Sequence, residues 1–449
     1  MMLECMLFLM LVHYSARITF PPIEETRMNM MKPILQAICC GLIALATSSA
    51  QSLTTKPSPV VKLGIDVLME RDFDVLKGKR IGLVTNPTGI SANGTQTIDV
   101  LFDAKDVNLV ALFGPEHGVR GDVEAGKYVE NYNDPSTGLP VFSLYGRTRK
   151  PTREMLKGID VLVYDIQDIG VRSYTYISTM GLIMEAAAEN DLTVVVLDRP
   201  NPLTGDRVGG PMLDLKYKSF VGAYQIPYVY GMTAGELAEM INLEGWLSNG
   251  APCKLVVVPM EGWNRSMWWD DTGLMWVPTS PHIPHWSTSI FYVLTGLLGE
   301  LGTANQGVGY TLPFELVGGS WIDADRLAQY LNALRLDGVY FRPLWYKPFY
   351  FDTSSARYQG VQIHVVDRER LDFTEVQIQI LNALRRLFPE KDIFERSAAA
   401  RIEMFDKVVG SNELRLDMIR NIPVSELLRK LDQQRATFMI KREKYLLYD

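Results

Sequence analysis

Short apolar runs alternate with amphipathic segments along the first two thirds of the chain. Each run is four to seven residues long and ends at a glycine, a proline or a polar residue, as buried strands do. We predict strands over 80–85, 107–113, 161–165, 192–197 and 255–258. We predict helices over 97–102, 151–156 and 180–189, and a further helix that begins with a capping box of Thr233 and Glu236. This alternation favours an α/β fold with a Rossmann-like, mostly parallel sheet and helices on both faces.

The pattern changes at about residue 263. Residues 263–319 are rich in aromatic residues, glycine and proline, which predicts long irregular loops of the kind that are usually functional. We predict helices over 323–336, 373–388 and 424–438, and a strand over 360–366. A chain of 449 residues exceeds the about 250–300 residues at which one hydrophobic core usually divides. We therefore expect a Rossmann-like domain over 61–305 and a smaller C-terminal auxiliary α/β domain over 306–449.

The first fifty residues have the pattern of a leader. Met31-Lys32 is a short basic segment, 34–47 is apolar, and Ser48-Ser-Ala50 is typical of a signal peptidase site. We predict a signal peptide over 1–50, a polar linker over 51–60, and export to the periplasm or the exterior of a bacterium. A lipid anchor at Cys39 and an uncleaved membrane anchor remain alternatives, although the apolar stretch is shorter than the about 20 residues that a membrane span needs.

Charge and cysteine content exclude several classes of protein. The net charge is −7 without basic clusters, which argues against a nucleic-acid partner. Outside the predicted leader the only cysteine is Cys253, so neither a disulfide framework nor a cysteine zinc site is expected. His282 and His285 have no third ligand at a spacing that suits zinc. No Gly-x-Gly-x-x-Gly follows an early strand, so we predict no metal and no cofactor, and no membrane span after signal cleavage.

Polar residues follow four of the predicted strands at the point where each strand ends. They occupy positions 85–86, 114–116, 165–168 and 198–201. The carboxyl ends of parallel strands emerge on one edge of a sheet, where α/β folds bind their ligands. The loop after the second strand is the densest in chemistry, since it holds Glu116, His117 and Arg120 among three glycines. The sequence predicts an active-site cleft here, with a solvated acid beside a structural histidine as the alternative.

Several motifs in these loops carry a resemblance to a known family. They are Asn86-Pro-Thr-Gly89, the segment 113–121, Ser143-Leu-Tyr-Gly146, and the segments 160–176 and 197–202. In these motifs, and over nearly everything after the leader, the chain resembles the exo-β-N-acetylmuramidase family of peptidoglycan hexosaminidases (NamZ-like proteins, formerly a domain of unknown function). The resemblance implies an exo-acting glycoside hydrolase of the bacterial envelope. Its expected activity is to release terminal β-linked N-acetylmuramic acid from peptidoglycan fragments (muropeptides).

Hydrolysis of a glycosidic bond needs a proton donor and, in most families, a second carboxylate. We predict Glu116 as the general acid, because a carboxyl group held at the end of a buried strand is partly desolvated and holds its proton more tightly. Asp165 or Asp168 is predicted as the second catalytic carboxylate. The alternative for Asp165 is an ion pair with Arg172 that fixes the loop.

Further residues at the same edge are candidate substrate contacts. Arg120 is predicted to bind the lactyl carboxylate of muramic acid, because arginine and carboxylate form bidentate pairs; an ion pair with Asp122 or Glu124 is the alternative. Asp198 and Arg199 are expected to form a structural ion pair. The predicted substrate-binding residues are Asn86, His117, Arg120, Tyr145, Arg172, Tyr176, Asn201 and His282.

Two departures from the family pattern bear on the substrate. Gly307-Val-Gly-Tyr-Thr311 stands where many members have Gly-Arg-Gly-Thr, and Tyr230-Gly231 stands where many have His-Gly. Both segments lie at expected substrate contacts. They leave a second reading of the function open, a non-catalytic protein of the envelope that binds cell-wall sugars, although Glu116 is intact.

Overall fold

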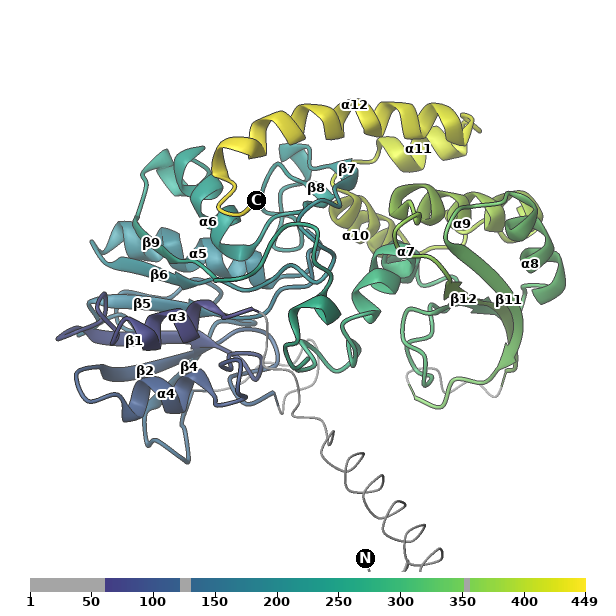
Figure 1. Cartoon of the computed structure of the whole chain (residues 1–449). Coiled ribbons are helices and arrows are strands. Elements are labelled where there is room, and N and C mark those ends of the chain that lie inside the picture. Colours follow the sequence, from purple (N-terminus) through teal and green to yellow (C-terminus); the bar gives the residue numbers. More distant parts are fainter. Residues whose placement is uncertain (1–60, 122–130, 351–355) are drawn as a thin grey trace, which may run out of the picture. The chain divides into compact units, whose positions relative to one another are not determined.

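A computed structural model describes residues 61–121, 131–350 and 356–449, so the predicted leader and linker lie outside the described residues. Its largest element is a seven-stranded sheet (Figure 1). In spatial order the strands are β3 (Tyr132–Asn133), β4 (Pro140–Ser143), β2 (Asn108–Gly114), β1 (Arg80–Thr85), β5 (Val161–Asp165), β6 (Thr193–Leu197) and β9 (Lys254–Val258). All neighbours are parallel except β3 and β4. The strand order reverses between β1 and β5, and α/β folds bind ligands beyond the carboxyl ends at such a point.

Helices cover both faces of this sheet. They are α3 (Gly64–Glu70), α4 (Thr97–Asp103), α5 (Tyr176–Glu189) and α6 (Ala234–Leu243). Val84 and Leu162 belong to the hydrophobic core that includes residues of α5 and α6, whereas their neighbours Leu83 and Val163 belong to the core with α3 and α4. Successive strand residues point to opposite faces, so one apolar run supplies both cores. The predicted Rossmann-like α/β fold is confirmed, as is the capping box of Thr233 at the start of α6.

The smaller C-terminal part is built on a three-stranded antiparallel sheet. Its order is β10 (Leu316–Gly319), β12 (Tyr358–Val365) and β11 (Val339–Tyr346). Its helices are α7 (Thr288–Leu301), α8 (Ala324–Ala333), α9 (Phe373–Leu387), α10 (Ala399–Val409), α11 (Glu413–Ile419) and α12 (Val424–Arg442). Residues of α7, α8 and α9 share one hydrophobic core with all three strands. The expected smaller C-terminal α/β part is thus confirmed, while its boundary at residue 305 stays a prediction.

The remaining elements are short. A ribbon of β7 (Gly209–Met212) and β8 (Pro227–Val229) is antiparallel. The 3-10 helices are η2 (Leu215–Tyr217), η3 (Ser248–Gly250), η4 (Trp269–Thr272), η5 (Pro389–Lys391) and η6 (Glu443–Tyr445). Within the described ranges, no helix is both long and apolar enough to cross a membrane.

Two predictions of local structure are wrong. The segment 151–156 forms successive turns instead of a helix, since it is short and Gly158 follows it in the left-handed region with φ of 81°. The expected irregular region 263–319 contains the 14-residue helix α7. Most residues of this helix are buried, including polar Thr295 and Gly296, so its sequence lacks the polar face by which surface helices are recognised.

Arg172 ties the Rossmann-like part to the C-terminal part. Its side chain is fully buried, and its guanidinium donates to the carbonyl oxygens of Pro211 and Ile226, at 2.7 and 2.6 Å. It also donates to the carbonyls of Val408 and Val409, at 2.9 and 2.7 Å, which end α10 and carry the partial negative charge of a helix C-terminus. Burial lowers the pKa of Arg172 to about 10, which leaves it charged at neutral pH.

These contacts correct the prediction for Arg172. The expected alternative, an ion pair with Asp165, is wrong, because four main-chain carbonyl groups surround the guanidinium. The reason is that a buried ribbon and a buried helix end bring unsatisfied carbonyls together, and one arginine supplies enough donors for all of them. The expected contact with substrate stays a prediction, which the full burial of Arg172 disfavours.

Replacing Arg172 with Gln is expected to destabilise the fold by about 3 kcal/mol or more, because buried carbonyl groups lose their donors. Urea unfolding followed by circular dichroism measures this loss. Arg386→Gln, an exposed position on α9, serves as the control and is expected to change stability by less than about 0.5 kcal/mol. Equal midpoints for Arg172→Gln and the wild type contradict the structural role.

Candidate active site

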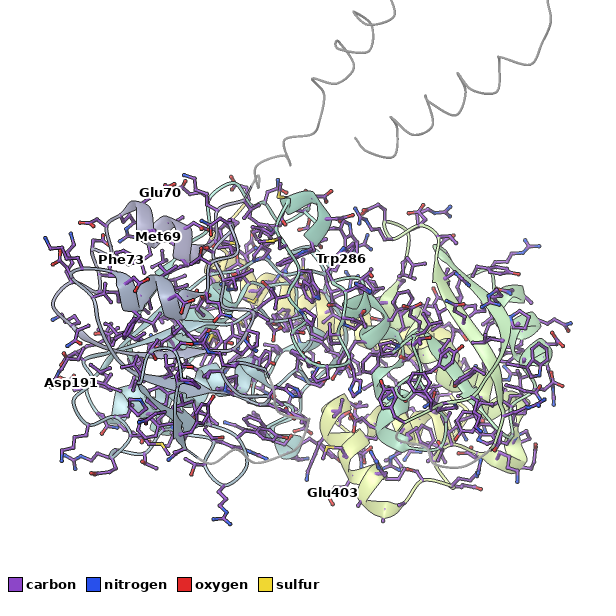
Figure 2. The ribbon with its side chains drawn as sticks, turned by 90° about the horizontal axis from the view of Figure 1, so that it is seen from below. Met69, Glu70, Phe73, Asp191, Trp286 and Glu403 are labelled. Atoms are coloured by element: carbon purple, nitrogen blue, oxygen red, sulfur yellow. The ribbon has the colours of Figure 1, made fainter. Side chains whose placement is uncertain are left out.

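A cavity of about 470 Å³ is lined by the loops that follow β2 and β4. Glu116 and His117 come from the first loop, and Tyr145 and Arg149 from the second. The start of α5 adds Tyr176, and side chains of α7 and α10 complete the wall. The cavity therefore lies on the edge of the sheet where the strands end, as the sequence predicts. The opposite edge, where β6 begins near Asp191, lies at the periphery (Figure 2).

A tight turn after β2 brings Glu116 to this cavity. The Gly118 N–H donates to the Pro115 carbonyl at 3.0 Å. His117 and Gly118 have φ of 74° and 75°, two consecutive residues in the left-handed region. A Cβ on Gly114 would lie 3.2 Å from the Gly118 Cα, so the chain can fold back this closely because position 114 is glycine. The three glycines of the loop thus set its path.

Two hydroxyl groups contact the Glu116 carboxyl group. Thr175 Oγ1 donates to Glu116 Oε2 at 3.3 Å, and the Tyr145 side chain forms a further hydrogen bond with Glu116. Burial, the charge of Glu116 and this hydrogen bond raise the pKa of Tyr145 to about 12. Tyr145 therefore stays protonated at neutral pH, and its hydroxyl is available as the hydrogen-bond donor to Glu116, which is half-buried. The structure brings these two predicted site residues into direct contact.

Tyr174 and Tyr176 form an aromatic wall of the cavity. Their ring centroids lie 5.0 Å apart with the planes at 80°. The Tyr174 hydroxyl donates to Thr279 Oγ1 at 2.7 Å, and that of Tyr176 to the Thr279 carbonyl at 2.5 Å. Tyr176 also hydrogen bonds with the side chain of Asn86, which is buried and does not line the cavity. Tyr176 thus presents its ring to the cavity, while Asn86 supports that ring.

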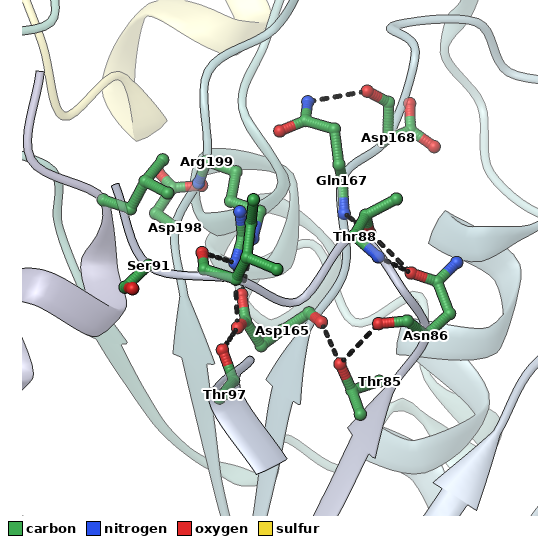
Figure 3. A network of polar contacts seen from close by, with 12 residues as sticks. Thr85, Asn86, Thr88, Ser91, Thr97, Asp165, Gln167, Asp168, Asp198 and Arg199 are labelled. Atoms are coloured by element: carbon green, nitrogen blue, oxygen red, sulfur yellow. Dashed lines mark hydrogen bonds and ion pairs between the residues drawn. The ribbon is translucent and has the colours of Figure 1, made fainter. Parts of the chain in front are cut away.

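Asp165 pairs with Arg199 at the end of β5 (Figure 3). The Arg199 Nε and Nη2 atoms donate to the two carboxylate oxygens at 2.5 and 2.9 Å, and Thr97 Oγ1 donates to Oδ2 at 2.5 Å. Both charged side chains are buried, so the bidentate pair compensates for the loss of hydration. The expected pairs of Asp165 with Arg172 and of Asp198 with Arg199 are therefore wrong.

Asp198 is held by neutral donors instead. Its carboxylate accepts hydrogen bonds from Thr233 Oγ1 at 2.6 Å, the Gly235 N–H at 2.8 Å and the Tyr448 hydroxyl at 2.6 Å. Burial raises its pKa to about 6. These contacts fasten the start of α6 and residue 448 to the end of β6. Because they satisfy the Asp198 carboxylate, the Arg199 guanidinium is available to pair with Asp165.

Asp168 is a second buried acid behind the cavity wall. Its Oδ1 accepts from the Tyr230 hydroxyl at 2.5 Å and from the Gly170 N–H at 2.7 Å, whereas its buried Oδ2 has no hydrogen-bond partner among the described residues. Burial raises the pKa of Asp168 to about 7. Neither Asp168 nor Asp165 lines the cavity that holds Glu116. Tyr230, which stands where the family pattern has a histidine, thus donates a hydrogen bond to Asp168.

Arg120 forms an ion pair with Asp134. Its Nε and Nη2 atoms both lie 2.9 Å from carboxylate oxygens of Asp134, and its Nη1 contacts Gln96 Oε1. Asp134 is fully buried and holds Arg120 in a bidentate pair. The alternative partners at 122 and 124 lie outside the described residues. Arg120 does not line the cavity.

Asn201 and His282 also lie off the cavity lining. Asn201 is buried and donates to the Met232 carbonyl at 3.0 Å. The His282 ring stacks on Tyr350 with centroids 6.1 Å apart and planes at 12°. Burial, and next the charge of the neighbouring His117, lower the pKa of His282, which favours its neutral form at neutral pH.

The structure therefore brings four predicted site residues to one cavity and leaves the others elsewhere. Those at the cavity are Glu116, His117, Tyr145 and Tyr176. Those away from it are Asn86, Arg120, Asp165, Asp168, Arg172, Asn201 and His282. Sequence reasoning missed Arg149, Tyr292, Glu300 and Lys407, which also line it. Arg149 lies three residues beyond the motif at 143–146, but nothing in the sequence connects α7 or α10 with these loops.

The described side chains offer little to a metal. Among residues 61–121, 131–350 and 356–449, no three His, Cys, Asp or Glu residues gather in a group that would hold an ion.

Comparison with family models gives two matches that follow one another along the chain. The model described as "Exo-beta-N-acetylmuramidase NamZ, N-terminal" matches residues 81–287, and "Exo-beta-N-acetylmuramidase NamZ, C-terminal" matches residues 290–448. The chain is also similar to the peptidoglycan beta-N-acetylmuramidase NamZ of Bacillus subtilis (strain 168). The two are 41% identical over 424 residues, which cover 93% of this chain and 100% of that protein.

Two solved structures share the fold. Both are crystal structures of DUF1343 family proteins from Bacteroides fragilis NCTC 9343. One is 50% identical with a TM-score of 0.83, and the match covers 88% of this chain and 100% of that chain. The other is 29% identical with a TM-score of 0.70, and covers 87% and 99%.

Asp168→Asn is expected to flatten the dependence of stability on pH between about 4 and 7. The folded pKa of about 7 lies above the about 3.9 of an unfolded aspartate, so the folded state keeps a proton that the unfolded state has released. The contribution of Asp168 to stability is thus fully present below about pH 4 and is lost as the pH rises towards 7. Urea midpoints of both proteins between pH 4 and 8 measure the slope.

The control is Asp325→Asn, at an exposed position on α8, which is expected to keep the wild-type slope. Asp198, whose pKa is also raised by burial, leaves a residual slope in every variant. Identical slopes for Asp168→Asn and the wild type would show that Asp168 is ionised in the folded state.

Proposed function

The chain belongs to the exo-β-N-acetylmuramidase NamZ family, and from this we propose that it is an exo-acting glycoside hydrolase with Glu116 as its general acid. Its substrates are peptidoglycan fragments, from which it releases terminal β-linked N-acetylmuramic acid. The match to the Bacillus subtilis relative spans that protein's full length, so no part of the relative lacks a counterpart here.

The placement of Glu116 carries the proposal for the acid. It is a half-buried carboxyl group that lines a cavity of about 470 Å³, within the range of small-ligand sites. A general acid must hold a proton close to the leaving oxygen and release it as the bond breaks. The Tyr145 and Thr175 hydroxyls orient the carboxyl group and stabilise the carboxylate that is left after proton transfer.

The residues that line the cavity suit a sugar. Tyr174, Tyr176 and Phe220 present rings, and the faces of sugar rings pack on aromatic side chains. Ser173 and Ser280 add hydroxyl groups that donate or accept hydrogen bonds. Apolar faces with a few polar groups are the usual composition of a site that binds a small molecule.

The second catalytic carboxylate remains a prediction that the geometry does not favour at Asp165 or Asp168. Asp165 has both oxygens engaged by Arg199 and Thr97, and Asp168 lies off the cavity lining. We propose instead that Asp165 fixes the loops at the ends of β5 and β6. Retention or inversion at the anomeric carbon depends on where the second group stands.

Export belongs to the same proposal. A hydrolase of peptidoglycan meets its substrate outside the cytoplasmic membrane, which agrees with the leader predicted over 1–50. We propose that the mature chain acts in the periplasm or outside the cell.

Glu116→Gln is expected to lower turnover of the disaccharide N-acetylmuramyl-β-1,4-N-acetylglucosamine by about 100-fold or more, because the leaving sugar alkoxide needs a proton. Turnover of 4-nitrophenyl β-N-acetylmuramide is expected to fall much less, since nitrophenolate leaves without protonation. Chromatography of the released sugars and absorbance of nitrophenol measure the two rates.

Glu154→Gln, an exposed acid outside the cavity, is the matched control and is expected to keep wild-type rates on both substrates. Wild-type turnover of the disaccharide by Glu116→Gln removes Glu116 from the acid role. Saturable binding of the disaccharide by the wild type without any product favours the alternative function of a sugar-binding protein.

A further inference from the structure

The cavity is also lined by cationic side chains that have no part in the proposed acid catalysis. Arg149 and Lys407 are the arginine and lysine side chains that line it. Lys407 is paired with Glu403 at 2.6 Å, and Glu403 lies at the surface of α10 (Figure 2). Among the described residues, no carboxylate forms an ion pair with Arg149. Its guanidinium carbon lies instead 4.2 Å from the centroid of the Phe220 ring.

Stacking on Phe220 fixes the position of the Arg149 guanidinium without neutralising its charge. A guanidinium over an aromatic face gains cation–π attraction, and it keeps N–H donors for a second, planar partner. An ion pair would neutralise the charge, as Asp134 does for Arg120. Arg149 is therefore oriented in the way that suits recognition of an anion at the edge of the cavity.

A chain of contacts links this cation to the general acid. Tyr145 hydrogen bonds with Glu116, and its ring centroid lies 6.5 Å from that of Phe220, on which Arg149 stacks. The charges of Glu116 and Arg149 both act on the Tyr145 hydroxyl, the first raising its pKa and the second lowering it. One tyrosine thus separates the acid from the cation within a single cavity.

A cationic side chain favours the binding of an anionic ligand. Glu116 and Glu300 line the cavity too, and burial raises the pKa of Glu300, which favours its neutral form. N-Acetylmuramic acid differs from N-acetylglucosamine by a lactyl ether that ends in a carboxylate. A positive charge beside the acid would therefore favour binding of a muramic acid substrate over a glucosamine substrate.

We infer that Arg149, stacked on Phe220, binds the carboxylate carried by the lactyl arm of the substrate and thereby selects muramic acid. The sequence analysis predicts this carboxylate-binding role for Arg120 instead. The inference rests on the proposed function, which supplies the muramic acid substrate. The recognised chemistry is a carboxylate, either that of a free lactyl group or that of a stem peptide joined to it.

Three substrates with the same leaving group test the inference. They are 4-nitrophenyl β-N-acetylmuramide, its lactyl methylamide, and 4-nitrophenyl β-N-acetylglucosaminide. Arg149→Gln is expected to lower kcat/KM on the first by roughly 10- to 100-fold, the loss of one charge-assisted contact. On the two neutral substrates the change is expected to stay within about threefold. Arg149→Lys is expected to recover part of the loss, and Arg153→Gln, outside the cavity, to keep wild-type values.

Each outcome decides the matter. A loss confined to substrates with a carboxylate supports the inference, and a 4-nitrophenyl muramide with a stem peptide then shows which carboxylate is bound. Equal losses on all three substrates, or no loss on any, overturn it. Where the wild type cleaves none of them, the proposed function has failed; calorimetry with N-acetylmuramic acid and its methylamide then tests Arg149 by itself, and equal affinities for wild type and Arg149→Gln overturn the inference.

Discussion

A buried ion pair between Asp165 and Arg199 is the constraint on which the edge of the sheet depends. It joins the ends of β5 and β6 beside the point where the strand order reverses, and Thr97 fastens the start of α4 to it. A charge without water is costly, so each of these groups requires its partner. The loops at this edge are therefore fixed by groups that satisfy one another, and the residues left for chemistry are those that face the cavity.

The other buried polar residues near the strand ends are satisfied in the same way. Asp198 accepts hydrogen bonds from neutral donors, Arg172 donates to main-chain carbonyls of both parts, and Asp134 forms an ion pair with Arg120. Glu116 differs from them, because it is half-buried, it lines the cavity, and the hydroxyl groups of Thr175 and Tyr145 are among its contacts. This placement in the cavity is the basis of the role of general acid that we propose for it.

The sequence was a good guide wherever one segment decides the structure. The apolar runs predicted β1, β2, β5, β6 and β9, the pair Thr233 and Glu236 predicted the start of α6, and Gly114-Pro115 predicted a loop at the end of β2. It failed where partners come from distant segments. Arg199 and Asp165 are 34 residues apart, and Arg172 meets a carbonyl 237 residues away, so local patterns offered wrong partners for both. The contribution of α7 and α10 to the cavity was invisible for the same reason.

A crystal structure with N-acetylmuramic acid bound is the most direct test of Glu116 and Arg149. We predict that the anomeric oxygen lies within hydrogen-bond distance of the Glu116 carboxyl group and that the lactyl carboxylate lies on the Arg149 guanidinium. A sugar bound elsewhere, or one whose anomeric oxygen faces away from Glu116, would contradict it.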